Sequence, residues 1–152
     1  MKNNLVIRAY NTNDKSAVLA ILRLNTPDYF SPDEEAGFIH FLDHEIELYY
    51  ITLLNDKIVG AGGINFNQQL KNGIISWGMI HPDYQRMSIG SALLKHRIEV
   101  LKNRREIEAI IVRTSQLVFK FYEKHGFEVI EIVKDYWAKD FDLYNMIYKE
   151  DQ

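Results

Sequence analysis

The chain has 152 residues, of which 47% are hydrophobic and 26% charged, and its formal net charge is −3. This size and composition fit one globular domain with its own core, and they exclude disordered, collagen-like and low-complexity chains. The sequence has no cysteine, which excludes a disulfide scaffold, a thiolate metal site and a cysteine nucleophile, and its weak negative charge argues against a dedicated nucleic-acid binder.

The N-terminal half of the chain predicts one strand, two helices and a strand meander. Residues 5–9 form a short apolar run, and apolar residues at helical spacing follow between Val18 and Leu24. A second helix is expected to begin at Ser31 or Pro32, with acidic residues near its positive end. Strands joined by polar turns are predicted at residues 49–54, 58–66 and 74–80.

The C-terminal half alternates helices and strands. The sequence His81-Pro82-Asp83 breaks the third meander strand, and Gly126 ends a helix in the usual C-terminal position. The apolar stripe of the longer helix consists of Leu93, Leu94, Ile98 and Leu101. The predicted helices span residues 89–103 and 117–125, and the predicted strands span residues 107–112, 127–133 and 143–148.

The chain is expected to be one cytoplasmic domain covering residues 1–152. Its first residues lack the long apolar core of a signal peptide. No apolar run approaches the roughly 20 residues that a membrane helix needs. No repeat, linker or shift in composition divides the sequence.

The densest candidate for a binding motif is the segment 84–94, which joins a predicted strand to the long helix. Small residues let a backbone approach a ligand closely, and the segment holds Ser88, Gly90, Ser91 and Ala92. A helix N-terminus presents unpaired N–H groups and a partial positive charge, and both favour a pyrophosphate. A strand–helix turn with small residues for packing is the alternative.

A second motif, residues 122–127, runs from a tyrosine through a helix end to Gly-Phe. Gln85, Ser88 and Gly90 stand upstream at the spacing of a loop written as Gln or Arg, two residues, Gly, one residue, then Gly or Ala. Together the two motifs resemble the GNAT superfamily of acyl-CoA-dependent N-acetyltransferases. The resemblance covers nearly the whole chain, because the order of elements also matches. It implies an α+β fold with a mixed, mostly antiparallel sheet and flanking helices.

Two positions depart from the family pattern. Ser88 replaces the first loop glycine, and if this position needs a positive φ, serine is strained there where glycine is not. Its hydroxyl could instead donate to a phosphate. Ser115 stands where the family often has asparagine, seven residues before Tyr122, so one hydroxyl replaces an amide that offers two groups. Both changes bear on the affinity for CoA.

The resemblance implies acetyl-CoA as co-substrate, no metal, and direct attack by an amine. The strands at 74–80 and 107–112 would splay to admit the acyl-CoA arm, with a backbone N–H near Ile80 facing the thioester oxygen. The absence of cysteine agrees with direct attack, because no acyl-enzyme can form on a thiol. The residues implied in acyl-CoA binding are Met79, Ile80, Gln85, Arg86, Met87, Ser88, Ile89, Gly90, Ser91 and Ser115.

Tyr122 matches the general acid of the family. A phenol has a pKa near 10 and a thiol a pKa near 8.5, so the phenol stays protonated at neutral pH and can donate to a leaving thiolate. The alternative is a core or rim tyrosine, because its helix also carries Phe119 and Phe121.

The sequence does not offer an obvious general base. Residues 74–80 contain no acid, and the only acid in 107–112 is Glu108 at its start, where an exposed strand end is expected. His81 titrates near neutral pH but is interpreted as part of a turn. We therefore expect a base relayed through water, or none. Either suits an α-amino group, with a pKa near 8, better than a lysine side chain near 10.4.

Four further clusters are interpreted mainly as ordinary structure. A basic stretch is read as a solvated helix face, with help for the CoA 3′-phosphate as the alternative, and comprises Lys95, His96, Arg97, Lys102, Arg104 and Arg105. Acids that could attract a cationic amine, or serve only as a helix N-terminus, are Asp28, Asp33, Glu34 and Glu35. Histidines at metal-ligand spacing, but without a third ligand, are His40 and His44. Aromatics that pack in strands, or line an acceptor pocket or dimer contact, are Tyr136, Trp137 and Tyr144.

The resulting hypothesis is an N-acetyltransferase that moves an acetyl group from acetyl-CoA to a primary amine of a small molecule or peptide. A non-catalytic acyl-CoA-binding or sensing domain on the same fold is the alternative. Neither a nucleic acid nor a membrane is expected as a partner, and a homodimer is left open.

Overall fold

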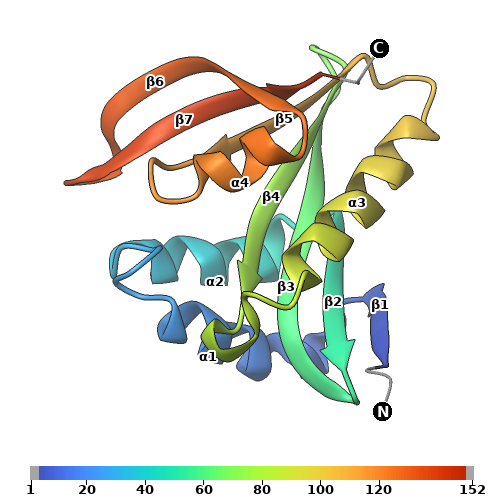
Figure 1. Cartoon of the computed structure of the whole chain (residues 1–152), viewed down its shortest axis with the longest axis vertical. Coiled ribbons are helices and arrows are strands. Elements are labelled where there is room, and N and C mark those ends of the chain that lie inside the picture. The colour runs from blue at the N-terminus through green and yellow to red at the C-terminus, as the bar shows by residue number, and fades with distance from the viewer. Residues whose placement is uncertain (1–3, 150–152) are drawn as a thin grey trace.

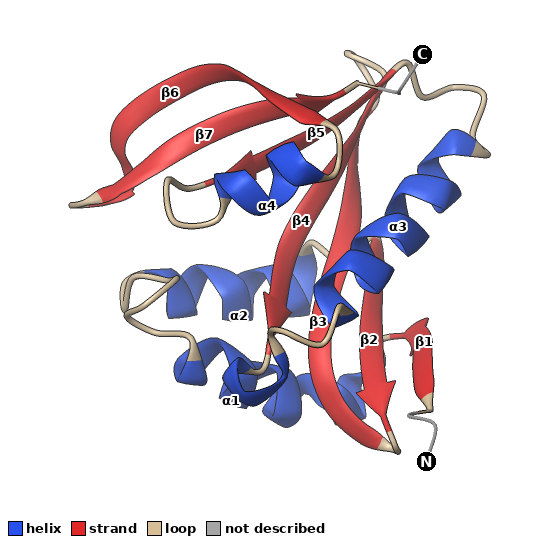
Figure 2. Cartoon of the chain, in the orientation of Figure 1, coloured by secondary structure: helices blue, strands red, loops and turns tan. Residues whose placement is uncertain are grey.

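The computed structural model describes residues 4–149 and confirms the predicted order of elements (Figures 1 and 2). The strands are β1 (Leu5–Ala9), β2 (Leu48–Leu54), β3 (Lys57–Asn67), β4 (Asn72–Ile80), β5 (Ala109–Thr114), β6 (Phe127–Ala138) and β7 (Phe141–Tyr148). The α-helices are α1 (Lys15–Leu24), α2 (Glu34–His44), α3 (Ile89–Lys102) and α4 (Phe119–Lys124). Two short 3₁₀ turns, η1 (Thr12–Asp14) and η2 (Pro82–Tyr84), precede α1 and α3.

All seven strands form one mixed sheet in the order β1-β2-β3-β4-β5-β7-β6. Every neighbouring pair is antiparallel except β4 and β5, which are parallel. This confirms the predicted α+β class with a mostly antiparallel sheet. The single parallel pair follows from α3, which carries the chain from the end of β4 back to the start of β5.

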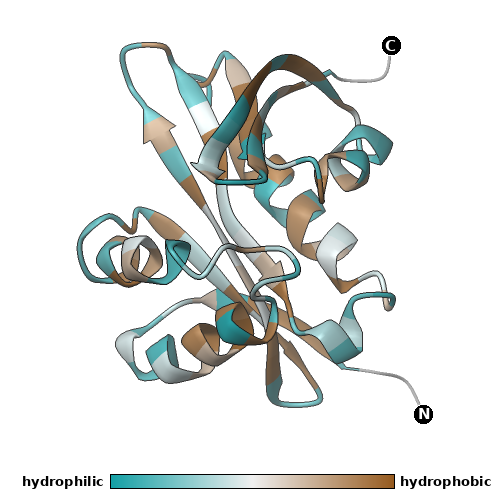
Figure 3. Ribbon diagram, turned by 90° about the vertical axis from the view of Figure 1, so that its left-hand side faces the viewer, coloured by the Kyte–Doolittle hydropathy of each residue, from teal (hydrophilic) through white to brown (hydrophobic). Residues whose placement is uncertain are grey.

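Helices cover both faces of the sheet (Figures 1 and 3). On one face, α1 and α2 pack Val18 and Phe38 against Ile51. On the other, α3 and α4 pack Leu94 and Tyr122 in a separate cluster that also includes residues of β3 to β7. The helices therefore turn apolar residues toward the sheet from both sides, as amphipathic helices require.

Several element boundaries differ from the prediction. β6 continues to Ala138 rather than ending at residue 133, and β7 begins at Phe141. Most of the added residues of β6 are exposed, so no apolar alternation marks them in the sequence. α4 is shorter than predicted, and it ends before Gly126, whose φ of 96° confirms the expected left-handed stop. No helix of the described part of the chain is long and apolar enough to cross a membrane.

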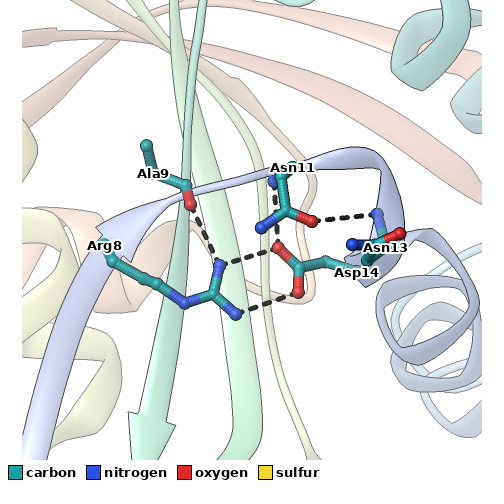
Figure 4. Close-up of polar contacts among 5 residues, drawn as sticks. All are labelled: Arg8, Ala9, Asn11, Asn13 and Asp14. Carbon is teal, nitrogen blue, oxygen red and sulfur yellow. Dashed lines mark hydrogen bonds and ion pairs between the residues drawn. The ribbon is translucent and has the colours of Figure 1, made fainter.

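A small polar network fixes the junction between β1 and α1 (Figure 4). The Arg8 guanidinium donates two hydrogen bonds to the Asp14 carboxylate, at 2.7 and 2.9 Å. Asp14 also accepts from the backbone N–H of Asn11, whose own side chain accepts from the N–H of Asn13. Asp14 is only 5% exposed. The hydrogen bonds from Arg8, more than any other effect, lower the pKa of Asp14.

Asp14→Asn is expected to lower the free energy of unfolding by about 2 kcal/mol at neutral pH, because it removes charge-assisted hydrogen bonds from a buried site. Since the pKa of Asp14 is lowered by folding, its stabilisation is present above the unfolded pKa of about 3.9 and is lost as the pH falls through the folded value. Urea unfolding of both proteins between neutral and acid pH measures this difference. The control is Asp43→Asn, which breaks the exposed ion pair with Lys15 and should change little. An equal loss in both variants would contradict the prediction.

Candidate active site

A cavity of about 540 Å³ opens where β4 and β5 separate. The parallel pairing ends at Ile75 and Val112, although β4 continues to Ile80 and β5 to Thr114. Beyond that point, β4 and β5 no longer pair with each other, and no other strand within residues 4–149 lies between them. The predicted splaying is therefore confirmed. The cavity extends to the α1–α2 loop, the first turn of α3, the helix α4 and the β6–β7 hairpin.

A distortion in β4 shapes the floor of this cavity. The register between β3 and β4 shifts opposite Gly62, and Trp77 takes a φ of 43°. The Tyr49 hydroxyl donates a 2.9 Å hydrogen bond to the Trp77 carbonyl. The Trp77 ring stacks with Phe30 of the α1–α2 loop, at 6.2 Å between ring centres. The bulge thus fixes β4 against both β2 and the loop that borders the cavity.

The end of β4 is held by two side-chain amides. Asn25 is buried and donates a 3.0 Å hydrogen bond to the carbonyl of Ile80. Gln85 donates to the Asn25 side-chain oxygen at 2.9 Å and to the Ile80 carbonyl at 3.3 Å. The Gln85 side chain thus connects the motif loop to the cavity, which Gln85, Ile80 and Met79 all line.

The loop after η2 delivers an uncapped helix end to the same cavity. Ser88 has φ 60° and ψ 16°, and no side chain caps α3. The backbone N–H groups of Ile89, Gly90 and Ser91 lie in the first turn, where a helix has no partners of its own for them. Arg86 and Met87 are exposed beside it. This segment has the features of an anion site: free N–H groups, the positive end of a 14-residue helix and one nearby cation.

α4 is fastened to this helix end through His125. Its Nε2 lies 2.9 Å from the Ser91 hydroxyl, and its Nδ1 lies 2.8 Å from the Phe121 carbonyl. The His125 and Phe121 rings also contact each other, at 4.7 Å between centres. These contacts fix the start of α3 relative to Tyr122, which follows Phe121 on α4.

Tyr122 lies in the cavity at the point where the strands separate. Its side chain is only 7% exposed and packs against Phe121 and Phe127. Burial raises the pKa of its phenol above the usual value, and the positive charge of Arg97 partly opposes this rise. A protonated phenol at neutral pH is what a proton donor requires.

Arg97 does not lie where the sequence analysis placed it. It was interpreted as part of a solvated basic face, but it is 2% exposed and lines the cavity. The interpretation is wrong for this residue because position 97 is one helical turn from both Leu93 and Leu101, on the buried side of α3. Lys95 and Lys102, by contrast, are exposed.

Glu34 supplies the carboxylate of the cavity. Among the described residues lining the cavity it is the only aspartate or glutamate. It sits at the first position of α2, and its Oε2 accepts a 2.8 Å hydrogen bond from the Ser31 N–H. Burial raises the pKa of this carboxyl group, while the bond from Ser31 acts in the opposite direction. The sequence analysis grouped Glu34 with acids that could attract a cationic amine or serve only as a helix N-terminus, because nothing in the local pattern distinguishes it from Glu35.

The family of this chain follows from a profile of the acetyltransferase (GNAT) family, which matches residues 18–127. The chain belongs to the GNAT family. A curated relative, N-alpha-acetyltransferase 50 of Danio rerio, is 29% identical over 99 residues, covering 61% of this chain and 58% of that protein. An N-alpha-acetyltransferase of Sulfurisphaera tokodaii is 24% identical over 157 residues, covering 92% of this chain and 90% of the relative.

The solved structures include GNAT folds of nearly the same extent. Naa50 of Arabidopsis thaliana, in complex with the bisubstrate analogue CoA-Ac-MVNAL, superposes with a TM-score of 0.73 at 17% identity. The superposition covers 96% of this chain and 99% of that one. At this identity the likeness concerns the fold, and it agrees with the GNAT architecture described above.

The structure brings most of the sequence-predicted residues to one cavity. Gly90, Ser115 and Tyr122 line it, together with Met79, Ile80 and Gln85. Ser115 is buried, and its hydroxyl oxygen accepts a 3.2 Å hydrogen bond from the Leu117 N–H. Arg86, Met87, Ser88, Ile89 and Ser91 form the adjoining loop and helix start.

The remaining candidates divide between the cavity and the surface. Trp137 lines the cavity and donates to the Thr114 carbonyl, while Tyr144 packs on Phe119. Glu108 is exposed, as expected. The rings of His40 and His44 contact each other on α2, and no group of three metal-ligating side chains occurs within residues 4–149.

Ser88→Gly is expected to raise the free energy of unfolding by about 0.5–1 kcal/mol. A non-glycine residue in the left-handed region costs about 1–2 kcal/mol, and the greater backbone entropy that glycine loses on folding offsets part of the relief of this strain. The observed φ of 60° is the condition for this effect. Thermal and urea unfolding measure it. Ser88→Ala is the matched control, since it removes the hydroxyl and keeps the strain. Equal stability of the two variants would refute the strain argument.

Proposed function

We propose that this GNAT protein transfers an acetyl group from acetyl-CoA to a primary amine by direct attack. The observation that supports the proposal is the cavity between β4 and β5, which is lined both by Tyr122 and by Gly90 in the first turn of the uncapped helix α3. A thiol leaving group and a pyrophosphate are the two parts of acyl-CoA that need these two features.

The residues present fit acyl-CoA. The N–H groups at the start of α3, with Arg86 beside them, would hold the pyrophosphate. The unpaired edge of β4 beyond Ile75 would hold the pantetheine arm through its backbone, and Ser115 would offer it a hydroxyl. The bound acetyl-CoA supplies an activated acyl group as a thioester. A backbone N–H near Met79 or Ile80 would donate to the thioester oxygen and stabilise the charge that develops there.

Two side chains would move the protons. Glu34 would accept a proton from the attacking amine, directly or through a water. The sequence analysis had instead expected a base relayed through water, or none. Its raised pKa brings it closer to that of an amine, which improves a carboxylate as a base. Tyr122 would donate its proton to the departing sulfur. The two groups border the cavity from different elements, α2 and α4, so the acyl carbon would lie between them.

An α-amino group is the acceptor we infer. The named relatives are N-alpha-acetyltransferases, and the Arabidopsis structure holds an analogue in which CoA is joined to a peptide. An α-amine near pKa 8 has a neutral fraction at pH 7 that a weak base such as a carboxylate can serve. The acceptor would enter between the α1–α2 loop, with Tyr29 and Glu34, and the β6–β7 hairpin, with Trp137.

Calorimetry with acetyl-CoA, followed by an assay for free CoA thiol with peptides, amino acids, polyamines and lysine peptides, tests the proposal. Binding together with turnover on peptides bearing a free α-amine is the expected result. Peptides whose α-amine is blocked serve as the matched control. Binding without turnover on any acceptor would favour a sensing domain, and the absence of binding would overturn the proposal.

A further inference from the structure

Arg97 is a buried cation with which no carboxylate among residues 4–149 forms an ion pair. Its guanidinium is bound by backbone carbonyls, with Nη1 3.3 Å from Gly63 O and 3.4 Å from Ser76 O, and Nε 3.4 Å from Leu93 O. None of the ion pairs found within residues 4–149 involves it. Burying an unpaired charge is unfavourable. A core that needed only packing at this position would be served better by an apolar side chain.

The two strands beneath Arg97 leave room for it by having glycines. A Cβ on Gly62 would stand 2.9 Å from the Arg97 Cζ and Nη1, which is too close. A Cβ on Gly78 would stand 3.3 Å from Nη2. The bulge of β3 and β4 therefore surrounds the guanidinium of Arg97 and fixes its position in the cavity.

That place adjoins the hydroxyl of Tyr122. A Cβ added to Gly78, which would lie 3.3 Å from Arg97 Nη2, would also lie 3.6 Å from the hydroxyl oxygen of Tyr122. The positive charge of Arg97 partly offsets the rise in the Tyr122 pKa that burial causes.

The other titratable groups among residues 4–149 that interact electrostatically with Arg97 are not acids. They are Tyr49 and Tyr50 on β2, and the neighbouring His96, whose pKa is lowered by burial and by the charge of Arg97. The Tyr49 hydroxyl is already engaged as a donor to the Trp77 carbonyl. Tyr122 is therefore the group through which a transient negative charge can reach the guanidinium.

We propose that Arg97 is a positioning residue whose fixed positive charge stabilises the phenolate of Tyr122 when that side chain gives up its proton. The proposal rests on the proposed function, in which the proton goes to the leaving sulfur. In that step the Tyr122 O–H bond breaks, an S–H bond forms, and CoA leaves as a thiol. The phenolate regains a proton from water, while the proton lost by the amine passes through Glu34 to water. The net change is amine plus thioester to amide plus thiol.

The charge can be tested without any turnover. 3,5-Difluorotyrosine placed at position 122 titrates at a lower pH than tyrosine, and ¹⁹F NMR reads its ionisation directly. Arg97→Gln keeps a hydrogen-bond donor and removes the charge, and Arg97→Lys keeps the charge. We expect Gln to weaken the acid dissociation constant at position 122 by tenfold or more and Lys to do so much less, since an adjacent opposite charge shifts a pKa by 1–3 units. An unchanged constant in a folded Gln variant would overturn the proposal.

A second measurement needs no change at Arg97, in case the Gln variant does not fold. The same probe at position 49 reports a second buried phenol, which the charge of Arg97 also affects but which donates to a backbone carbonyl. In the protein with Arg97 intact, position 122 is expected to ionise at a lower pH than position 49. The opposite order would overturn the proposal.

Kinetics separate this inference from the proposed function. Arg97→Gln should lower kcat and leave the KM for acetyl-CoA nearly unchanged. In a Tyr122→Phe background it should have no further effect, because the proton it assists is gone. If no acceptor is acetylated by the parent protein, the proposed function fails, and the ¹⁹F titrations still decide the role of Arg97.

Discussion

Replacing Tyr122 with phenylalanine is expected to lower kcat for acetyl transfer by at least tenfold while acetyl-CoA binding stays the same. Loss of a general acid lowers the rate by about 10²-fold or more when no other donor exists. The decrease is smaller when a water molecule can donate the proton in place of the phenol. Binding should persist because the groups that would hold the pyrophosphate are on α3 and its loop, not on α4. The phenyl ring retains the contacts with Phe121 and Phe127.

Steady-state thiol release and calorimetry on the same preparations measure the two halves of this prediction. Tyr50→Phe is the matched control, because Tyr50 is a half-buried tyrosine on β2 that does not line the cavity. It should leave both quantities unchanged. Full activity of Tyr122→Phe would remove this residue from the mechanism, and a parallel loss of CoA binding would show that the ring acts through packing.

The strength of the fold prediction came from periodicity. The stripe of Leu93, Leu94, Ile98 and Leu101 and the apolar strand predicted at residues 107–112 identified α3 and β5 within two residues. β6 was underestimated because it is an edge strand and its added residues Lys134, Asp135 and Tyr136 are exposed. Edge strands are specified by their partner and by twist more than by alternation, so sequence pattern alone ends them too early.

For the site, the sequence motifs could be recognised, but the burial of its charged side chains could not be predicted. The left-handed conformation of Ser88 could be anticipated, because the motif that this loop resembles has a glycine at that position. Arg97 could not be separated from its basic neighbours by composition. The available signal was its four-residue spacing from Leu93 and Leu101, together with the glycines of β3 that face it. A hydrophobicity scale does not identify such a residue as buried, because its burial depends on backbone carbonyls that are distant in the sequence.

Glu34 illustrates a different limit. Glu34 and Glu35 are adjacent and chemically identical, yet Glu35 forms an exposed ion pair with Arg23 while Glu34 turns into the cavity. The difference arises from the path of the α1–α2 loop and its packing on Trp77 through Phe30. Only tertiary structure carries that information, so a search for a base that considered the two strands and His81 did not single out Glu34 at the start of α2.

Glu34→Gln is expected to lower kcat/KM for an α-amine by at least tenfold, because the amide cannot accept the proton of the attacking nitrogen. Its side-chain oxygen can still accept the bond from Ser31, so folding should be preserved. Glu35→Gln is the matched control, and it should leave kcat/KM unchanged, since it alters only an exposed ion pair.

The pH profile gives this prediction its sharpest form. Glu34 must be ionised to act as base, and burial raises its pKa, so the acid limb due to Glu34 should lie above the ordinary glutamate value. Below the pKa of the amine, log kcat/KM should rise with a slope of one; below the pKa of Glu34 the slope should increase to two, because two groups must then lose protons. In Glu34→Gln the slope should remain one throughout. A slope of two that survives the substitution would assign the base to another group, and a slope of one in the parent protein would return the mechanism to a water-relayed base.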